Sequence, residues 1–236
     1  MKKLAAVMML LGWCLWASAE VGDIEDTIPH IPEPMVFDLM RPLHARAGEV
    51  EVNTIGILPP GGRLKWAPEL EATLLDGLAI EVEMPFENLN FESMKLGLQA
   101  TLGHDDSNVH GVQFLAQKPR SAGGFDVTGL YLWGHRMSNE WSLLSMTGVE
   151  VGRGWKGLQN LSLFFEPNND VVLGLETQFK FSAEKFLEQM SFIPQIHLSL
   201  GTDASLQLGA GWTRYANRGW ETSVGFRLIF DLTPNR

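Results

Sequence analysis

Apolar and polar side chains alternate along most of the chain. In "FESMKLGLQATLG", residues 91–103, Met94 and Leu96 fall on one parity, whereas Lys95 and Gln99 fall on the other. Successive side chains of a β-strand point to opposite faces, so this pattern predicts a strand with one apolar and one polar face. The segments "LAIEVEM", "LQLGAGW" and "VGFRLIF" alternate in the same way.

Twelve alternating segments follow one another, and turn-forming stretches such as "DG" at 76–77 and "EPNND" at 166–170 separate them. A tilted strand that crosses a bilayer needs about 9–11 residues, which matches these lengths. The segments "HGVQFLAQ" and "GLQNLSLFF" carry apolar residues on both parities, which leaves a count of about ten strands open. The predicted strands are Glu49–Leu58, Lys65–Leu75, Leu78–Pro85, Phe91–Gly103, Val109–Gln117, Phe125–Gly134, Glu140–Val151, Leu158–Phe165, Val171–Phe181, Phe192–Leu200, Ala204–Arg214 and Gly219–Leu232.

The apolar strand faces meet either a packed core, as in a soluble sandwich, or lipid, as in an outer-membrane barrel. Aromatic residues near strand ends favour lipid, because amphipathic rings prefer the headgroup level. The last segment, "WETSVGFRLIFDL", is similar to the C-terminal signal of outer-membrane barrels, although "TPNR" follows it. We therefore predict an all-β fold, a closed antiparallel transmembrane β-barrel of about 12 strands. The aromatic residues are Trp66, Trp133, Trp141, Trp212, Tyr215 and Trp220.

The first 19 residues have the three parts of a secretory signal peptide. Lys2 and Lys3 supply the positive charge, residues 4–16 supply the apolar run, and "ASA" at 17–19 supplies the small residues of a cleavage site. A membrane anchor is the alternative. Cys14, the only cysteine, lies in this segment, so the processed chain offers no disulfide and no thiolate metal site.

The processed chain is strongly acidic. Without Lys2 and Lys3 it keeps 16 of the 18 Lys and Arg residues against 28 Asp and Glu residues, a formal charge of −12. This charge argues against nucleic acid as a partner. No apolar stretch of about 18 residues follows the signal peptide, so we expect no transmembrane helix.

Residues 20–47 differ from the rest of the chain because they are rich in proline and show no sustained alternation. We interpret them as a periplasmic lead-in segment to the barrel, which occupies residues 48–236. Within the lead-in, Met35–Ala45 ("MVFDLMRPLHA") either belongs to a loosely held periplasmic tail or folds into the barrel, and the tail is the preferred interpretation.

The connections between the predicted strands divide by charge when they are taken alternately. One set is mainly basic and the other is mainly acidic, with Arg136 as the exception. A basic outer rim suits the phosphates of lipopolysaccharide, so we expect outer-membrane lipid and lipopolysaccharide as partners, together with the barrel-assembly machinery. The basic set holds Arg63, Lys118, Arg120, Arg153, Lys156, Lys185 and Arg218 beside Glu87, Glu184 and Glu188, and the acidic set holds Asp76, Asp105, Asp106, Glu140, Glu166, Asp170 and Asp203.

Three stretches carry a family resemblance: "FDLMRPLHARAGEVEVNT", "WAPELEATLLDGLAIEVEMPFE" and "KLGLQATLG". The chain resembles small Gram-negative outer-membrane β-barrel proteins. The stretches are similar to proteobacterial barrels described as outer-membrane transporters and to those named after the meta-pathway of phenol degradation. The resemblance covers about residues 36–103 and the final strand. It implies a barrel in the cell outer membrane, and it implies no particular cargo and no catalytic residue.

In such a barrel the polar-parity residues point into a narrow lumen and form an acidic wall with a few cations. Like-charged walls repel anions, so we predict an outer-membrane channel for passive transport of small solutes, preferably cations or neutral molecules. The alternative is a non-conducting structural or interaction barrel with a plugged lumen. The residues expected to line the lumen and set its selectivity are Glu69, Glu71, Glu81, Glu83, Lys95, Gln99, Glu176, Gln178, Lys180 and Arg227.

A further, less favoured alternative is a lipid-modifying outer-membrane enzyme. His197 and Ser199 share one strand face, but no third member of a catalytic triad is evident. An Asp-rich turn with nearby histidines is more often a solvated turn than a metal site. We therefore predict no enzyme activity, no catalytic residue, no metal site and no cofactor. The turn considered for a metal contains His104, Asp105, Asp106 and His110.

Overall fold

The structure is a computed structural model, and it describes residues 28–233 apart from Asp38, Gly61, Ala122 and Arg153. The predicted signal peptide, residues 1–19, lies outside the described residues. The described chain contains no helix that is long and apolar enough to cross a membrane.

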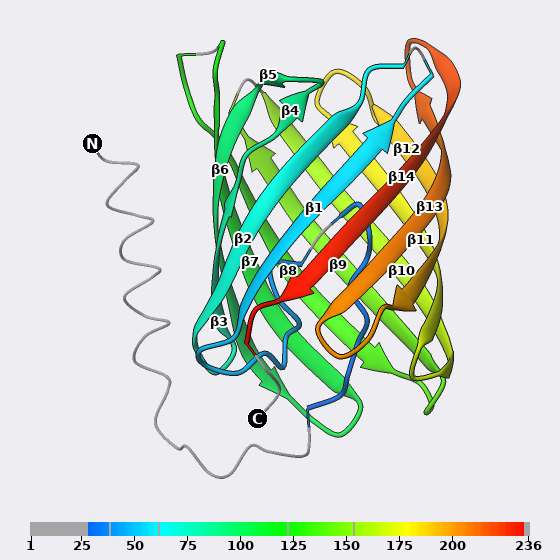
Figure 1. The fold of residues 1–236 in the computed structure, drawn as a ribbon. Helices are drawn as coiled ribbons and strands as arrows, with labels where there is room; N and C mark the ends of the chain where they lie inside the picture. The colour runs from blue at the N-terminus through cyan, green and yellow to red at the C-terminus, as the bar shows by residue number, and fades with distance from the viewer. Residues whose placement is uncertain (1–27, 38, 61, 122, 153, 234–236) are drawn as a thin grey trace.

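Twelve antiparallel strands form a closed barrel (Figure 1). Closure comes from β1, which pairs on one side with β2 and on the other with the last strand, β14. A two-stranded hairpin, β4 (Phe86–Glu87) and β5 (Asn90–Phe91), extends the edge of β2. The barrel strands are β1 (Val50–Leu58), β2 (Lys65–Leu75), β3 (Leu78–Glu83), β6 (Ser93–His104), β7 (Asn108–Pro119), β8 (Asp126–Arg136), β9 (Trp141–Val151), β10 (Trp155–Asn168), β11 (Val171–Ser182), β12 (Gln189–Ser199), β13 (Ala204–Tyr215) and β14 (Gly219–Asp231).

All twelve strands predicted from the alternation are present, and most bounds agree within two or three residues. The predicted fold class, an all-β closed antiparallel barrel of about 12 strands, is confirmed. The small β4–β5 hairpin was not predicted. It turns at Asn88, which has a φ of 54°, a left-handed conformation that asparagine tolerates better than most residues.

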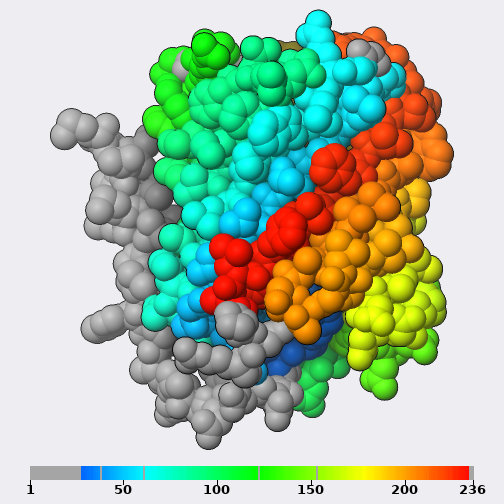
Figure 2. Space-filling model, in the orientation of Figure 1, coloured from blue at the N-terminus to red at the C-terminus, as the bar shows by residue number. Residues whose placement is uncertain are grey.

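The polar face of the sheet points inward and the apolar face points outward, which is the reverse of the arrangement in a soluble protein. On β2 the side chains of Ala67, Glu69 and Glu71 are buried, whereas Leu70 is 50% exposed. Carboxylates inside and leucines outside suit a barrel whose exterior meets hydrocarbon. The soluble sandwich is therefore wrong for this chain. Its outer wall is continuous over β1, β13 and β14 in the space-filling view (Figure 2).

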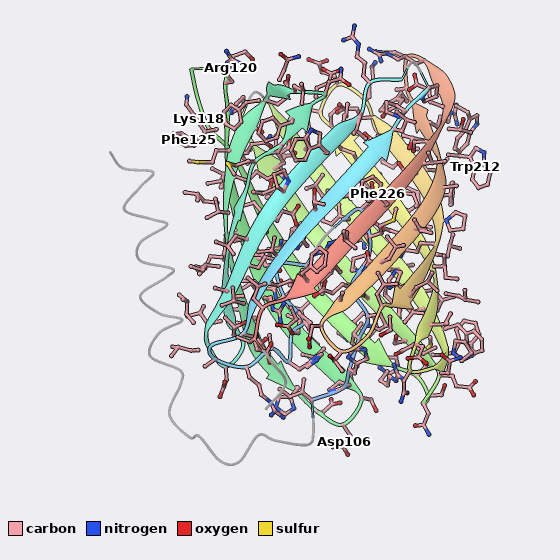
Figure 3. The ribbon with its side chains drawn as sticks, viewed as in Figure 1. Asp106, Lys118, Arg120, Phe125, Trp212 and Phe226 are labelled. Carbon is pink, nitrogen blue, oxygen red and sulfur yellow. The ribbon has the colours of Figure 1, made fainter. Side chains whose placement is uncertain are left out.

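Aromatic rings gather near both ends of the barrel wall. At one end Trp66 stacks on Phe86 with ring centroids 4.8 Å apart, and at the other Trp141 lies 4.8 Å from Phe165. Trp212 projects outward from the wall in Figure 3. Rings at these two levels are typical of the aromatic girdles of membrane barrels.

The strand order places the alternate connections at opposite ends, as the charge pattern predicts. Figure 3 shows Lys118 and Arg120 at one end and Asp106 at the other. We call these the basic end, which carries the β1–β2 and β7–β8 connections, and the acidic end, which carries the β2–β3 and β6–β7 connections. Arg153, one of the predicted basic residues, lies outside the described residues.

The described part of the lead-in segment lies inside the barrel. Residues 28–37 and 39–47, here called the plug, enter at the acidic end, rise into the lumen and return to β1 (Figure 1). Met35, Leu39 and Met40 are at most 1% exposed. The structure thus differs from the preferred interpretation of a loose tail and agrees with the alternative in which Met35–Ala45 folds into the barrel. Residues 20–27 lie outside the described residues.

Candidate functional site: the plugged lumen

Wall side chains bind the plug backbone on the β11–β12 side of the lumen. The carboxylate of Glu176 accepts hydrogen bonds from the backbone N–H groups of Val36 and Phe37, at 3.1 and 2.7 Å. Gln195 accepts one from the N–H of Met35 at 3.1 Å. Glu176 is fully buried. These wall side chains therefore supply hydrogen-bond acceptors to plug N–H groups that would otherwise need water as their partner.

The opposite side of the plug is bound by β6. Gln99 accepts a hydrogen bond from the N–H of Met40 and donates one to the carbonyl of Arg41, at 3.2 and 2.6 Å. The Thr101 hydroxyl donates to the carbonyl of Leu43 at 2.6 Å. Strands on opposite walls thus fix the same segment, which defines one docked position for it.

A charged cluster connects the plug to β1, β2 and β14. Arg227 is fully buried, and its guanidinium lies 3.1 Å from Glu33 of the plug, 3.8 Å from Glu51 and 3.6 Å from Glu71. Arg41 of the plug pairs with Glu51, and with Glu49 at 2.9 Å. The plug therefore contributes one carboxylate and one guanidinium to the cluster, and both are paired with the wall.

All ten residues predicted to line the lumen occupy inward-facing positions. Cross-strand pairing brings the acidic ones together, since Glu71 lies opposite Glu81 and Glu69 lies opposite Glu83. The remaining residues are distributed around the wall. Gln99 and Glu176 bind the plug, Gln178 donates to Glu176, Lys95 pairs with Glu83, Lys180 pairs with Glu150, and Arg227 pairs with Glu33, Glu51 and Glu71. Their role in selectivity stays a prediction.

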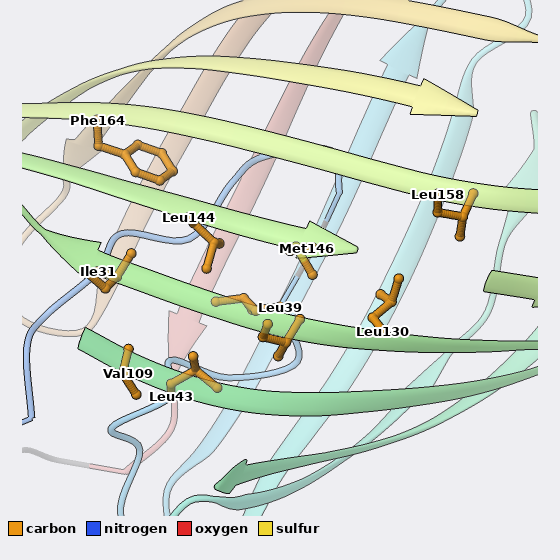
Figure 4. Close-up of a cluster of buried hydrophobic side chains, with 10 residues drawn as sticks. Ile31, Leu39, Leu43, Val109, Leu130, Leu144, Met146, Leu158 and Phe164 are labelled. Carbon is orange, nitrogen blue, oxygen red and sulfur yellow. The ribbon is translucent and has the colours of Figure 1, made fainter. Parts of the chain in front are cut away.

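The wall formed by β7 to β10 has an apolar patch that faces the plug, which the alternation did not predict, beside buried polar residues such as Gln113 and Asn160. Leu39 and Leu43 of the plug pack against this wall, where Leu144 and Met146 are completely buried (Figure 4). Leu132 of the same cluster is also completely buried. The available signal was the presence of apolar residues on both parities in "HGVQFLAQ" and "GLQNLSLFF". In β10 the apolar residues on the inward parity, Leu158 and Phe164, belong to the cluster with the plug, whereas those on the other parity face lipid. The full cluster comprises Ile31, Leu39, Leu43, Val109, Leu130, Leu132, Leu144, Met146, Leu158 and Phe164.

Two inward-facing glycines make room for the methionines of the plug. A Cβ added at Gly97 would lie 2.1 Å from Cε of Met40, and one added at Gly209 would lie 2.6 Å from Cε of Met35. Real Cβ atoms do not approach other atoms so closely, so a larger residue at either position would push the flexible end of the facing methionine aside. The wall is therefore shaped to the plug as well as bonded to it.

The lumen stays open above the plug, towards the basic end. One cavity of about 220 Å³ has Phe37 of the plug at its floor, and a second, of about 160 Å³, has Met35 and Val36. The larger cavity is lined mainly by amides and charged groups, whereas the smaller one also has Ile57, Pro59 and Ile193 in its wall. The larger cavity is lined by Phe37, Lys95, Leu115, Gln117, Thr128, Glu150, Leu158, Gln178, Lys180 and Gln189 among others. The described lumen is thus a polar cup that the plug closes at its base.

The structure gives no support to the catalytic and metal alternatives. The Ser199 hydroxyl donates to the carbonyl of Gly201 at 2.9 Å, and His197 faces the lumen against Phe164. Asp105 accepts hydrogen bonds from its own turn, from Ser107 and Asn108, and these lower its pKa. Within the described residues, no group of three or more His, Cys, Asp or Glu side chains is arranged to hold a metal.

No protein-family profile matches the chain, and no curated protein matches it either. Solved structures do match. The KdgM porin in complex with disordered oligogalacturonate has a TM-score of 0.63 at 9% identity, over 75% of this chain and 97% of the porin. The NanC porin has a TM-score of 0.63 at 11% identity, over 77% and 100%. The COG4313 outer-membrane channel from Pseudomonas putida F1 has a TM-score of 0.61 at 10% identity, over 86% and 100%.

The fold is that of outer-membrane barrel channels. At these identities the likeness concerns the fold alone, and the predicted location in the cell outer membrane agrees with it. The resemblance to barrels named after the meta-pathway of phenol degradation is not shown by these structures.

Proposed function

We propose that the protein is an outer-membrane channel for small polar solutes that its own N-terminal segment closes. The docked plug is the observation that carries this proposal. Its backbone is bonded to β6, β11 and β12, while the lumen above it remains open and polar. Passage through the barrel then requires the plug to move, so the docked arrangement is the closed state.

The wall chemistry supports a preference for cations. With the plug displaced, Glu33 and Arg41 leave the charged cluster together, and Glu51, Glu69 and Glu71 remain on the wall. Carboxylates that line a narrow pore attract cations and repel anions. The prediction that the protein is not an enzyme stays a prediction.

A non-conducting structural barrel is the second candidate, because the same contacts that close the lumen also hold opposite walls together. Glu176 of β11 and Gln99 of β6 bind one short segment from two sides. If this network never opens, the plug is a permanent part of the core. Conductance distinguishes the two candidates.

The test is single-channel conductance in planar bilayers, with a tethered plug as the matched control. We expect the wild-type protein to show discrete openings and a reversal potential that favours K⁺ in a KCl gradient. Met35→Cys with Gly209→Cys allows a short bifunctional thiol reagent to tie the plug to β13, because these two side-chain positions are adjacent. We expect this tether to abolish the openings.

The same double variant without the reagent should conduct like the wild type. An absence of steps at any salt concentration in wild-type and untethered protein would support the structural barrel. Openings that survive the tether would show that ions bypass the plug.

For its partners, we propose that the basic end faces lipopolysaccharide. Arg120 is exposed there beside Lys118, whose ammonium lies 5.2 Å from the ring centre of Phe125. A cation next to an apolar ring suits the boundary between phosphate groups and acyl chains. Contact with the barrel-assembly machinery remains a proposal that rests on the final strand of the sequence.

Acid is expected to loosen the plug through His44. Burial, together with repulsion from His30, Arg41 and Arg46, lowers the pKa of His44 to about 4. A released His44 has its ordinary pKa of about 6.5, so the released state binds more protons at pH values between about 6.5 and 4. Docking is therefore complete above about pH 6.5 and weakens as the pH falls, by about 2 kcal/mol at pH 5.

The measurement is the open probability between pH 7.5 and pH 5. We expect it to rise in acid in the wild type and to rise much less in His44→Gln. The remaining rise in that variant reports His30, the other plug histidine, whose pKa burial also lowers. Equal pH profiles for the two proteins would remove His44 from this role.

A further inference from the structure

The plug presents one cation and two apolar side chains to the lumen wall. The segment Leu39–Leu43 has a guanidinium, that of Arg41, on one side, and Leu39 and Leu43 on the other. The guanidinium meets the carboxylates of Glu49, just before β1, and of Glu51 in β1. The leucines meet the apolar patch of β7 to β10. This segment is therefore an amphipathic cation bound between an acidic wall and an apolar wall.

We propose that the lumen at this level is a binding site for small amphipathic cations, organic molecules that join an ammonium, amidinium or guanidinium group to an apolar body. Such a molecule would replace Arg41 at Glu49 and Glu51, and it would replace Leu39 and Leu43 on the apolar wall. That these cations are the transported solutes rests on the proposed channel function, whereas their binding does not.

The site has a further feature that points to a cation. Glu71 is fully buried and lies near Glu51, on the neighbouring strand. Its Oε1 accepts a hydrogen bond from Asn53, whereas its Oε2 has no hydrogen-bond partner among the described residues. A buried carboxylate oxygen without a donor favours the approach of a positively charged donor group.

The two opposed walls also explain why positive charge alone is insufficient for tight binding at this site. Bare cations would gain contacts from the acidic wall only, and apolar molecules would gain contacts from Leu132, Leu144 and Met146 only. A molecule with both parts obtains both contributions, as the plug does. The apolar part is short, since Leu39 and Leu43 are only four residues apart in the segment that contains Arg41.

The test measures the binding of four matched probes by calorimetry in detergent micelles. Benzamidinium, benzamide and benzoate share one ring and differ in charge, and guanidinium carries the charge without the ring. The full-length double variant Leu39→Ala/Arg41→Ala removes the plug groups that occupy the site. We expect benzamidinium to bind this variant at least tenfold more tightly than each of the other three probes, and more tightly than it binds the wild type.

Two further variants locate the site. Adding Glu51→Gln to the double variant should weaken benzamidinium binding at least tenfold, while the matched change Glu184→Gln, on the exposed β11–β12 connection, should not alter it. If the double variant fails to fold, Arg41→Ala alone serves the same comparison, because it vacates Glu49 and Glu51. Similar binding of all four probes, tighter binding of benzoate, or an unaltered affinity after Glu51→Gln would overturn the proposal.

Conductance measurements on the same protein show whether a failure concerns the binding site or the channel. Benzamidinium that binds to a barrel without openings would leave the site standing and remove the transport role. Openings with no preference among the probes would leave the channel standing and remove the site.

Discussion

Replacing Arg227 with methionine is expected to lower the free energy of unfolding by about 3–5 kcal/mol. The guanidinium is completely buried, and three carboxylates, those of Glu33, Glu51 and Glu71, lie within 4 Å of it. Without it Glu33 and Glu71 lose this partner in the lumen, and Glu51 keeps only Arg41. Removing one partner of a buried charge network is strongly destabilising because the remaining charges are left uncompensated.

Guanidinium-induced unfolding in detergent micelles, followed by circular dichroism, measures this loss. Arg214→Met is the matched control, since Arg214 is an exposed arginine on the strand next to β14. We expect the control to change the stability by less than about 1 kcal/mol, as surface substitutions usually do. Equal losses in the two variants would show that the cluster is not what stabilises this part of the barrel.

Replacing Leu39 with aspartate is expected to release the plug. Leu39 is 1% exposed and packs in the cluster with Leu132 and Leu144. The substitution removes the apolar contacts and places a carboxylate against an apolar wall, and the lost leucine contacts alone correspond to about 2–5 kcal/mol. This corresponds to a shift of the docking equilibrium by roughly 30-fold to several thousandfold.

The reactivity of a single thiol measures this release. Met40→Cys places a thiol at a fully buried plug position, so a maleimide should modify it slowly in an otherwise unchanged protein. Adding Leu39→Asp should accelerate the modification at least 30-fold and raise the open probability of the channel. The control is Phe186→Asp, which introduces the same charge at a side chain that is 90% exposed. Unchanged reactivity with Leu39→Asp would mean that the apolar wall does not hold the plug.

The sequence predicted the barrel wall because the period of two is a local property. In each strand of the barrel wall, leucine, valine or phenylalanine residues are concentrated on one parity. This parity alone determines which side chains share a face. The same rule predicts that Glu69, Glu71 and Arg227 all face the lumen. The alternation of basic and acidic connections followed from strand count and antiparallel order, which are also readable along the chain.

The plug was not predictable by the same means. Its position depends on hydrogen bonds between residues far apart in sequence, such as Phe37 with Glu176 and Met40 with Gln99. Residues 28–47 have no period of their own, so nothing local distinguishes a tail in water from a segment in a lumen. The apolar inner wall of β7 to β10 looked like weak alternation, because a pattern shows that a residue is apolar and not what it contacts.

The sequence by itself thus determined the strands, their two faces and the charge of each end of the barrel. Only the tertiary structure decided that the lumen is closed at its base. Closure depends on which distant groups form hydrogen bonds with the buried carboxylates and amides of the wall and which side chains pack against its leucines. Arg227 shows the difference: its inward direction follows from the parity of β14, whereas its partner Glu33 comes from a segment almost two hundred residues earlier in the chain. Alternation specifies the direction of a side chain, and packing in three dimensions specifies its neighbour.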